Sequence, residues 1–200
     1  FSTGSIVTWA EPGVGAIATQ AMVEARYGPK GMEGLRKGRT PQDVLDELLN
    51  ADEGREIRQV AMIDSQGRVA THTGNRTIAE AGHIIGNGYS VQANMMLNNT
   101  VWSAMSTAFE SSSGPLPERL LAALDAAQAE GGDIRGMQSA AMLVVSDKRT
   151  DTPWLETLVD LRVEDHPTPL VELRRLLSLR SAYDAMDRGD ALLGNGDVEG

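Results

Sequence analysis

The stretch RQVAMIDSQGRVATHTG (Arg58–Gly74) decides the fold, because it is the clearest β-hairpin pattern in the chain. Apolar, β-branched positions predict two strands, and Asp64–Gly67 between them supplies residues that favour a tight turn. The second strand ends at His72 and Thr73, with Gly74 following. Strand ends hold polar side chains rigidly at the solvent boundary. We therefore take His72, Thr73 and Gly74 as candidate binding residues; the alternative is that His72 only bonds local backbone.

Extended and helical patterns alternate on either side of this hairpin. Before it, residues 5–22 read as two extended segments joined at a Pro-Gly turn, and residues 27–38 and 40–52 as two short helices. Thr40 before Pro41 is a typical helix start. After it, residues 82–96 continue the extended region through a Gly-Asn-Gly turn. The N-terminal half thus predicts strands, a helix pair and strands again.

The C-terminal half repeats this order. Residues 99–111 and 116–130 predict helices, residues 138–146 and 156–165 predict strands, and a long helical pattern begins at Pro167. His166 before it is expected to cap the helix entry. Such an order suits an α+β fold: either two sheets between helical layers, or one mixed sheet with helices on one face.

Composition excludes several classes of function. The net charge of −10 disfavours nucleic acid and anionic membranes as partners. The chain has no cysteine, no histidine spacing typical of a metal site, and no apolar run long enough for a membrane helix or a signal peptide. We expect a soluble, cytoplasmic protein without metal or cofactor.

Two further groups of polar residues are candidates for a site. In YSVQANMM (residues 89–96), alternation places Gln92 and Asn94 on one strand face, where two amides could orient a substrate carbonyl. They could equally lie on the solvated face of an edge strand. Asp133 and Gln138 precede the most apolar strand, as an internal network or as a pocket wall.

Several blocks, taken together, resemble a known family. They are AEPGVGAIATQA, YGPKGMEGLRKG, DEGREIRQVAMID, HTGNR, GYSVQANMM, GPLPERLLAALDAAQAEGGDIRGMQSAAMLVV and VDLRVEDHPTPLVELRRLL. They resemble the bacterial and archaeal proteins of the domain of unknown function 1028 family. The resemblance implies a fold similar to that of the N-terminal nucleophile hydrolases, a four-layer α-β-β-α sandwich. On this basis residues 1–179 form that domain, and residues 180–200 begin a helical C-terminal extension.

The resemblance also implies an activity. In N-terminal nucleophile hydrolases the first residue, a Thr, Ser or Cys, attacks an amide carbonyl with its own α-amine as base. This sequence starts at Phe1, so we assign no nucleophile. We expect hydrolysis of a small amide or peptide-like substrate, with the substrate-binding residues His72, Thr73, Gly74, Gln92, Asn94, Asp133 and Gln138. The alternative is a non-catalytic binding domain or an oligomeric scaffold, and we expect a homo-oligomer.

Overall fold

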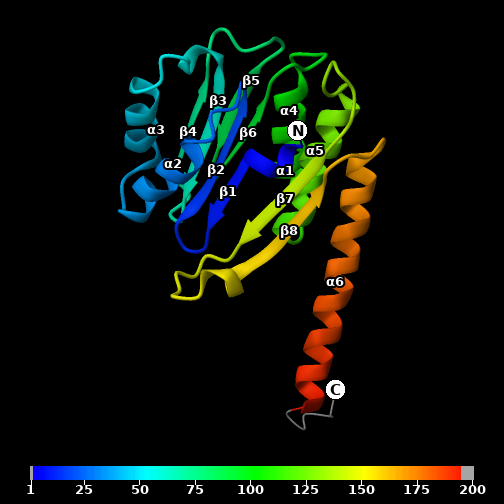
Figure 1. The fold of residues 1–200 in the computed structure, drawn as a ribbon. Coiled ribbons are helices and arrows are strands. Elements are labelled where there is room, and N and C mark those ends of the chain that lie inside the picture. Colours follow the sequence, from blue (N-terminus) through cyan, green and yellow to red (C-terminus); the bar gives the residue numbers. More distant parts are fainter. Residues whose placement is uncertain (1, 195–200) are drawn as a thin grey trace.

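The computed structural model describes residues 2–194 and has mixed helices and antiparallel sheets, which confirms the α+β class (Figure 1). The strands are β1 (Thr8–Glu11), β2 (Gly15–Ala21), β3 (Arg58–Asp64), β4 (Val69–Thr73), β5 (Gly82–Gly86), β6 (Tyr89–Ala93), β7 (Ala140–Val145) and β8 (Thr157–Val163). The helices are α1 (Thr3–Ile6), α2 (Tyr27–Arg36), α3 (Pro41–Asn50), α4 (Val101–Ser111), α5 (Leu116–Ala129) and α6 (Pro169–Gly194), with 3₁₀ turns η1 (Arg55–Ile57) and η2 (Pro153–Glu156).

The predicted hairpin is present as β3 and β4. These strands belong to a four-stranded antiparallel sheet in the order β1-β2-β3-β4. The pairs β5–β6 and β7–β8 form separate two-stranded sheets, so the structure has three hydrogen-bonded sheets where one or two were expected. The extended segment expected from Ser5 starts only at Thr8, because α1 precedes it, held by bonds from Thr3 to the Ser139 hydroxyl.

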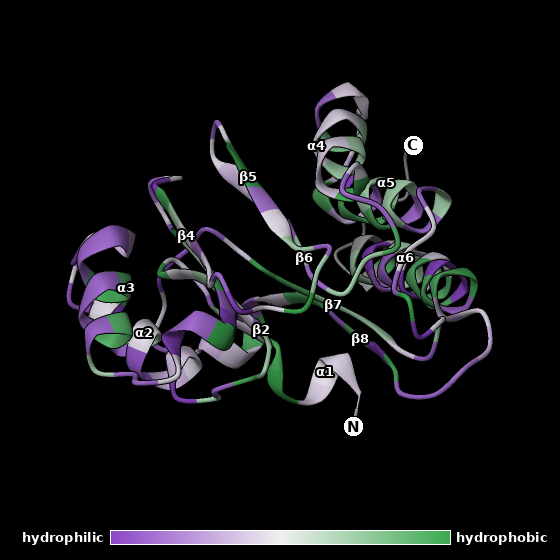
Figure 2. Ribbon diagram, turned by 90° about the horizontal axis from the view of Figure 1, so that it is seen from above, coloured by the Kyte–Doolittle hydropathy of each residue, from purple (hydrophilic) through white to green (hydrophobic). Residues whose placement is uncertain are grey.

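The elements are arranged in layers around the four-stranded sheet. Helices α2 and α3 pack on one face of that sheet, and β5–β6 and β7–β8 lie on its other side (Figure 2). Helices α4, α5 and α6 lie beyond these two hairpins. Thr40 caps α3 as predicted, since its hydroxyl oxygen accepts a bond from the Asp43 N–H at 3.1 Å and Pro41 follows.

Helix α2 approaches the sheet unusually closely because glycines face it. A β-carbon at Gly28 would lie 2.3 Å from the Trp9 indole, and one at Gly31 would lie 2.5 Å from Ile17. Apolar side chains from α2, α3 and the sheet then form one buried core, which includes the fully buried Leu45 and Val60. This core fixes one face of the sheet and leaves the other to carry polar groups.

A buried ion pair joins α2, the end of α3 and β3. The Asp52 carboxylate accepts bonds from Arg58 Nε at 2.9 Å, from the Gly54 N–H at 2.8 Å and from the Tyr27 hydroxyl at 3.1 Å. Arg58 also donates to the Met22 carbonyl at 2.6 Å. Burial raises the pKa of Asp52, but Arg58, Gly54 and Tyr27 together lower the pKa below its ordinary value.

A second core lies between β7–β8 and the helices, with Leu121 and Leu173 fully buried. Helix α6 begins on this core and then extends away from the body of the protein (Figure 1). Within the projecting part, Leu179, Tyr183 and Met186 are exposed. The helix is continuous through residues 179 and 180, where the sequence predicts the end of the domain. Residues 195–200 of the predicted extension lie outside the described residues.

Candidate functional site

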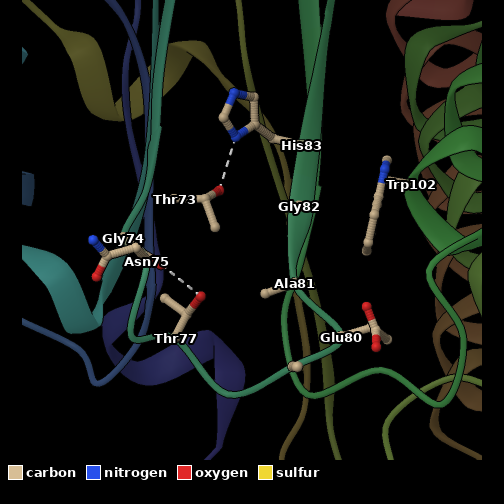
Figure 3. Close-up of a pocket in the computed structure, with 10 residues that line it drawn as sticks. Thr73, Gly74, Asn75, Thr77, Glu80, Ala81, Gly82, His83 and Trp102 are labelled. Atoms are coloured by element: carbon tan, nitrogen blue, oxygen red, sulfur yellow. Dashed lines mark hydrogen bonds between the residues drawn. The ribbon is translucent and has the colours of Figure 1, made fainter.

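A pocket of about 480 Å³ opens where the loop after β4 meets the start of β5 (Figure 3). Six side chains that line it are those of Thr73, Asn75, Thr77, Glu80, His83 and Trp102. Thr73 ends β4, His83 lies in β5, and Trp102 comes from the first turn of α4. The loop between the strands contributes the rest of the lining. The pocket is therefore built from one strand end, one loop and one helix start.

Thr73 and His83 form a hydrogen-bonded pair across this pocket. Thr73 Oγ1 lies 2.8 Å from His83 Nδ1, and Figure 3 shows the two side chains pointing toward one another. Burial lowers the pKa of His83, with a smaller contribution from the nearby His72. His83 is therefore neutral at pH 7, and each of its ring nitrogens has a distinct role as donor or acceptor.

Behind this pair, the amide of Gln59 links two sheets. Gln59 is fully buried. Its Nε2 lies 3.0 Å from Thr73 Oγ1, 3.0 Å from the Gly82 carbonyl and 2.9 Å from the Ala93 carbonyl. Gly82 and Ala93 are paired residues of β5–β6, so one side chain of β3 holds the end of that hairpin against β4.

The oxygen of the Gln59 side-chain amide also accepts hydrogen bonds. Gln59 Oε1 accepts bonds from Gln20 Nε2 at 2.8 Å and from Asn94 Nδ2 at 3.1 Å. Asn94 is itself buried. We call Gln20, Gln59, Thr73 and Asn94 the inter-sheet network. Through the Gln59 amide, this network holds the Thr73 hydroxyl in a fixed position. A threonine on a flexible surface segment would lack such support.

Glu80 and Trp102 form the other side of the pocket. Figure 3 shows the Trp102 indole facing β5, and the Glu80 carboxylate lies lower in this view, below the edge of the ring. A β-carbon at residue 82 would lie 2.7 Å from the indole ring, so glycine there lets the ring lie against the strand. The backbone of Glu80 is fixed by two bonds with Met96, at 3.1 Å and 3.0 Å.

The structure brings together only part of the site that the sequence predicts. Thr73 and Gly74 line the pocket. His72 lies on the opposite face of β4, because neighbouring strand residues alternate, and its Nε2 lies 2.8 Å from the Arg55 carbonyl. Asn94 lies behind the pocket, in the inter-sheet network.

Three other predicted residues lie outside the pocket. Gln92 points toward the four-stranded sheet, with Nε2 3.4 Å from the Ala18 carbonyl, and its Oε1 is buried without a partner among the described residues. The Asp133 carboxylate lies 2.6 Å from the Arg135 guanidinium. Burial raises the pKa of Asp133, but its bonds with Arg135 lower it more, so the pKa is below its ordinary value. Gln138 is exposed, and its carbonyl accepts a bond from the His166 N–H at 2.8 Å. His166 Nδ1 accepts a bond from the Thr168 N–H at 3.0 Å, so it bonds the turn that precedes α6 and not an N–H within the helix.

Sequence reasoning missed Asn75, Thr77, Glu80, His83 and Trp102. One signal could have found His83. Asn87-Gly88 is the two-residue turn typical of a hairpin, and counting back from it pairs His83 with Gln92. Both residues then share a sheet face, so the argument made for Gln92 applied to His83 as well.

Metal and membrane sites can be considered for residues 2–194 only. Within them no group of three or more His, Cys, Asp or Glu side chains is placed to hold a metal ion. None of the described helices combines the length and apolarity needed to cross a bilayer.

Comparisons with known proteins agree with the family resemblance. A model of the family described as "Family of unknown function (DUF1028)" matches residues 1–173. The crystal structure of protein SPO2555 from Silicibacter pomeroyi, which carries the same family description, superposes with a TM-score of 0.77. It is 32% identical, and the match covers 88% of this chain and 76% of that chain. No curated protein matches significantly. The chain therefore belongs to the DUF1028 family, whose function is unknown.

Proposed function

We propose that the pocket between β4 and β5 binds a small amide or peptide-like molecule. The observation that carries this proposal is the Thr73–His83 pair, held in a pocket of about 480 Å³ by a buried amide network. The Thr73 hydroxyl and the neutral His83 imidazole offer a donor and an acceptor suited to a carbonyl and an N–H. A preorganised polar pocket of this size fits a ligand of a few residues.

Amide hydrolysis is the reaction that this pocket would support. A hydroxyl within hydrogen-bond reach of a neutral imidazole is the general arrangement for activating an oxygen nucleophile. Gln59 Nε2 lies 3.0 Å from Thr73 Oγ1, which leaves the hydroxyl proton free to point to His83. The layer order of helix pair, sheet, hairpins and helices further supports a relationship to the N-terminal nucleophile hydrolases.

Replacement of Thr73 tests the proposal. Valine has nearly the same shape but no hydroxyl, so Thr73→Val should weaken binding of short peptide amides roughly tenfold, the value of one good hydrogen bond. Thr73→Ser keeps the hydroxyl and should restore binding. Isothermal titration with a panel of peptide amides gives the affinities, and amine release during long incubation reports hydrolysis.

The matched control is Thr107→Val, an exposed threonine of α4 outside the pocket, which should leave binding unchanged. If no peptide amide binds the wild-type protein, or if Thr73→Val binds as well as wild type, the proposal is wrong. Binding without any amine release would favour a binding domain over a hydrolase.

A second candidate function, an oligomeric scaffold, is favoured by the projecting part of α6. Leu176, Leu179, Tyr183 and Met186 follow the alternating three- and four-residue spacing of a coiled-coil seam, Asp190 takes the next seam position, and Leu193 takes the one after it. Leu179, Tyr183, Met186 and Leu193 are exposed on it, between 45% and 62%. An antiparallel pairing with a second copy would bring Arg180 of each chain to Asp187 of the other, which is charge-complementary.

This pairing predicts a dimer in solution. Light scattering after size exclusion should give twice the chain mass for the wild-type protein, and Tyr183→Glu with Met186→Glu should give a monomer, because charges would enter the seam. Ser181→Glu, one turn from the seam centre on the outer side, should remain a dimer. A wild-type monomer at high micromolar concentration would rule out this assembly.

A further inference from the structure

We infer that Gln59 and Thr71 hold the His83 imidazole in a single tautomer, in which Nε2 carries the proton. Nδ1 is then open to the proton of the Thr73 hydroxyl. The inference adds two positioning residues to the site, and their use in catalysis rests on the proposed amide hydrolysis. The tautomer itself is a property of the protein without a ligand, so it is tested separately from that function.

The bonds of the Gln59 amide decide where the Thr73 proton points. Gln59 Nε2 lies 3.0 Å from Thr73 Oγ1, and its other acceptors are the carbonyls of Gly82 at 3.0 Å and Ala93 at 2.9 Å. An amide nitrogen donates and does not accept, so the Thr73 hydroxyl cannot give its proton to Gln59. In the described part of the chain, the other atom bonded to this hydroxyl is His83 Nδ1, at 2.8 Å.

One tautomer of His83 satisfies both groups. Burial lowers the pKa of His83, so the ring is neutral at pH 7 and one nitrogen carries the proton. A proton on Nδ1 would point at the Thr73 oxygen, and the Thr73 proton would then have no acceptor among residues 2–194. With the proton on Nε2, Nδ1 accepts the Thr73 proton while the Thr73 oxygen accepts from Gln59. The second form is favoured because it leaves no half-buried donor unsatisfied.

Thr71 supplies an acceptor on the other side of the ring. Alternation along β4 places Thr71 and Thr73 on the same face, about 7 Å apart, and β5 lies beside this strand. Figure 3 shows Nε2 on the side of the His83 ring that is turned away from Thr73. The Thr71 hydroxyl oxygen is buried and has no hydrogen-bond partner among the described residues. It is therefore suited to accept the Nε2–H once its side chain turns toward the ring.

The tautomer determines how a proton moves in the proposed reaction. Thr73 Oγ1 bonds to the amide carbonyl carbon, the carbonyl electron pair moves to its oxygen, and the Thr73 proton passes to His83 Nδ1. The imidazolium gives this proton to the amide nitrogen, and the C–N bond breaks as the electron pair returns. Water then attacks the Thr73 ester, which releases the acid and restores the hydroxyl. Because Thr71 holds the Nε2–H throughout, the ring keeps Nδ1 facing Thr73.

Nitrogen NMR of the histidine side chains tests the inference. Long-range proton–nitrogen correlations show which ring nitrogen carries the proton in each of the three histidines. Assignment follows from His72→Asn and His166→Asn, each of which removes one set of signals. At neutral pH, the wild-type protein should show a protonated Nε2 and an unprotonated Nδ1 for His83. A protonated Nδ1 would overturn the inference.

Threonine variants of nearly equal shape identify the positioning residues. Thr73→Val removes the proton that Nδ1 accepts, and Thr71→Val removes the acceptor for the Nε2–H. Each should allow both tautomers, so that the two nitrogen signals of His83 move toward one another. Thr107→Val, the exposed control on α4, should keep the wild-type signals. Wild-type signals in Thr71→Val would also overturn the inference.

Gln59→Leu removes the amide that directs the Thr73 proton. It should likewise mix the tautomers of His83 in protein that circular dichroism shows to be folded, and a single Nε2–H tautomer there would contradict the role given to Gln59. Thr71 does not line the pocket, so Thr71→Val should slow amine release from a peptide amide roughly tenfold without changing its affinity. If the tautomer is as expected but no peptide amide is bound or cleaved, the proposed function fails while the assignment of the ring stands.

Discussion

Gln59→Leu is expected to destabilise the protein by about 3–5 kcal/mol, because it removes the centre of the inter-sheet network. Leucine fits a similar volume but can neither donate nor accept. The Gly82 and Ala93 carbonyls and the amides of Gln20 and Asn94 would lose their bonds to the Gln59 amide. Each buried group left unsatisfied costs roughly 1–3 kcal/mol, and partial relaxation keeps the total below the sum. Urea unfolding followed by circular dichroism measures the change.

Two other glutamine variants show whether the effect belongs to the network. Gln20→Ala removes one bond to Gln59 and should cost about 1 kcal/mol. Gln42→Ala removes an exposed side chain that bonds only Asp46 across one helical turn, and should change stability by less than about 0.5 kcal/mol. Equal effects for Gln59 and Gln42 would contradict the structural role assigned to the network.

Asp52→Asn is expected to cost about 3 kcal/mol at pH 7, because it leaves the Arg58 guanidinium buried without a counter-charge. Arg58 and Asp52 side chains are only 16% and 9% exposed, and breaking a buried pair by removing one partner costs roughly 3–5 kcal/mol. The amide retains part of the hydrogen bonding, which favours the lower value. Chemical unfolding at pH 7 gives the difference directly.

The stability lost in Asp52→Asn should also depend on pH, and it should become smaller as the pH falls. Since the pKa of Asp52 is lowered in the folded state, its contribution is present above the unfolded pKa, about 3.9, and is lost as pH falls through the folded value. The gap between wild type and Asp52→Asn should therefore narrow below about pH 4. Asp160→Asn, in an exposed pair with Arg162, should cost under about 0.5 kcal/mol. A gap independent of pH between 5 and 3 would contradict the account.

The sequence predicted the elements that depend on neighbouring residues. The β3–β4 hairpin follows from alternation around a tight turn, and α3 from Thr40 and Pro41 at its start. The number of sheets could not be predicted, because it depends on whether separate hairpins hydrogen-bond to one another. Here β5–β6 is joined to the four-stranded sheet by side chains such as Gln59. Neither a turn motif nor a hydrophobic periodicity in the sequence indicates such a contact.

Only the part of the candidate site that depends on neighbouring residues could be predicted from the sequence. Thr73 and Gly74 were found because a strand end is visible in the sequence. Asp133 was proposed as a pocket residue, yet its partner is Arg135, only two positions away. Glu80 and Trp102 come from a loop and a helix start that meet only in the folded chain, so neither could be joined to Thr73 by spacing alone.

The close approach of α2 to the sheet has a consequence for the order of folding. Each glycine within a helix costs about 1 kcal/mol relative to alanine, and α2 carries Gly28, Gly31 and Gly34 within ten residues. An isolated helix of this length is marginal even without glycine. Helix α2 therefore cannot act as an early local nucleus. It becomes helical when it can pack on Trp9, Ile17 and Met62. We therefore expect the sheet to form first and α2 to form on its surface.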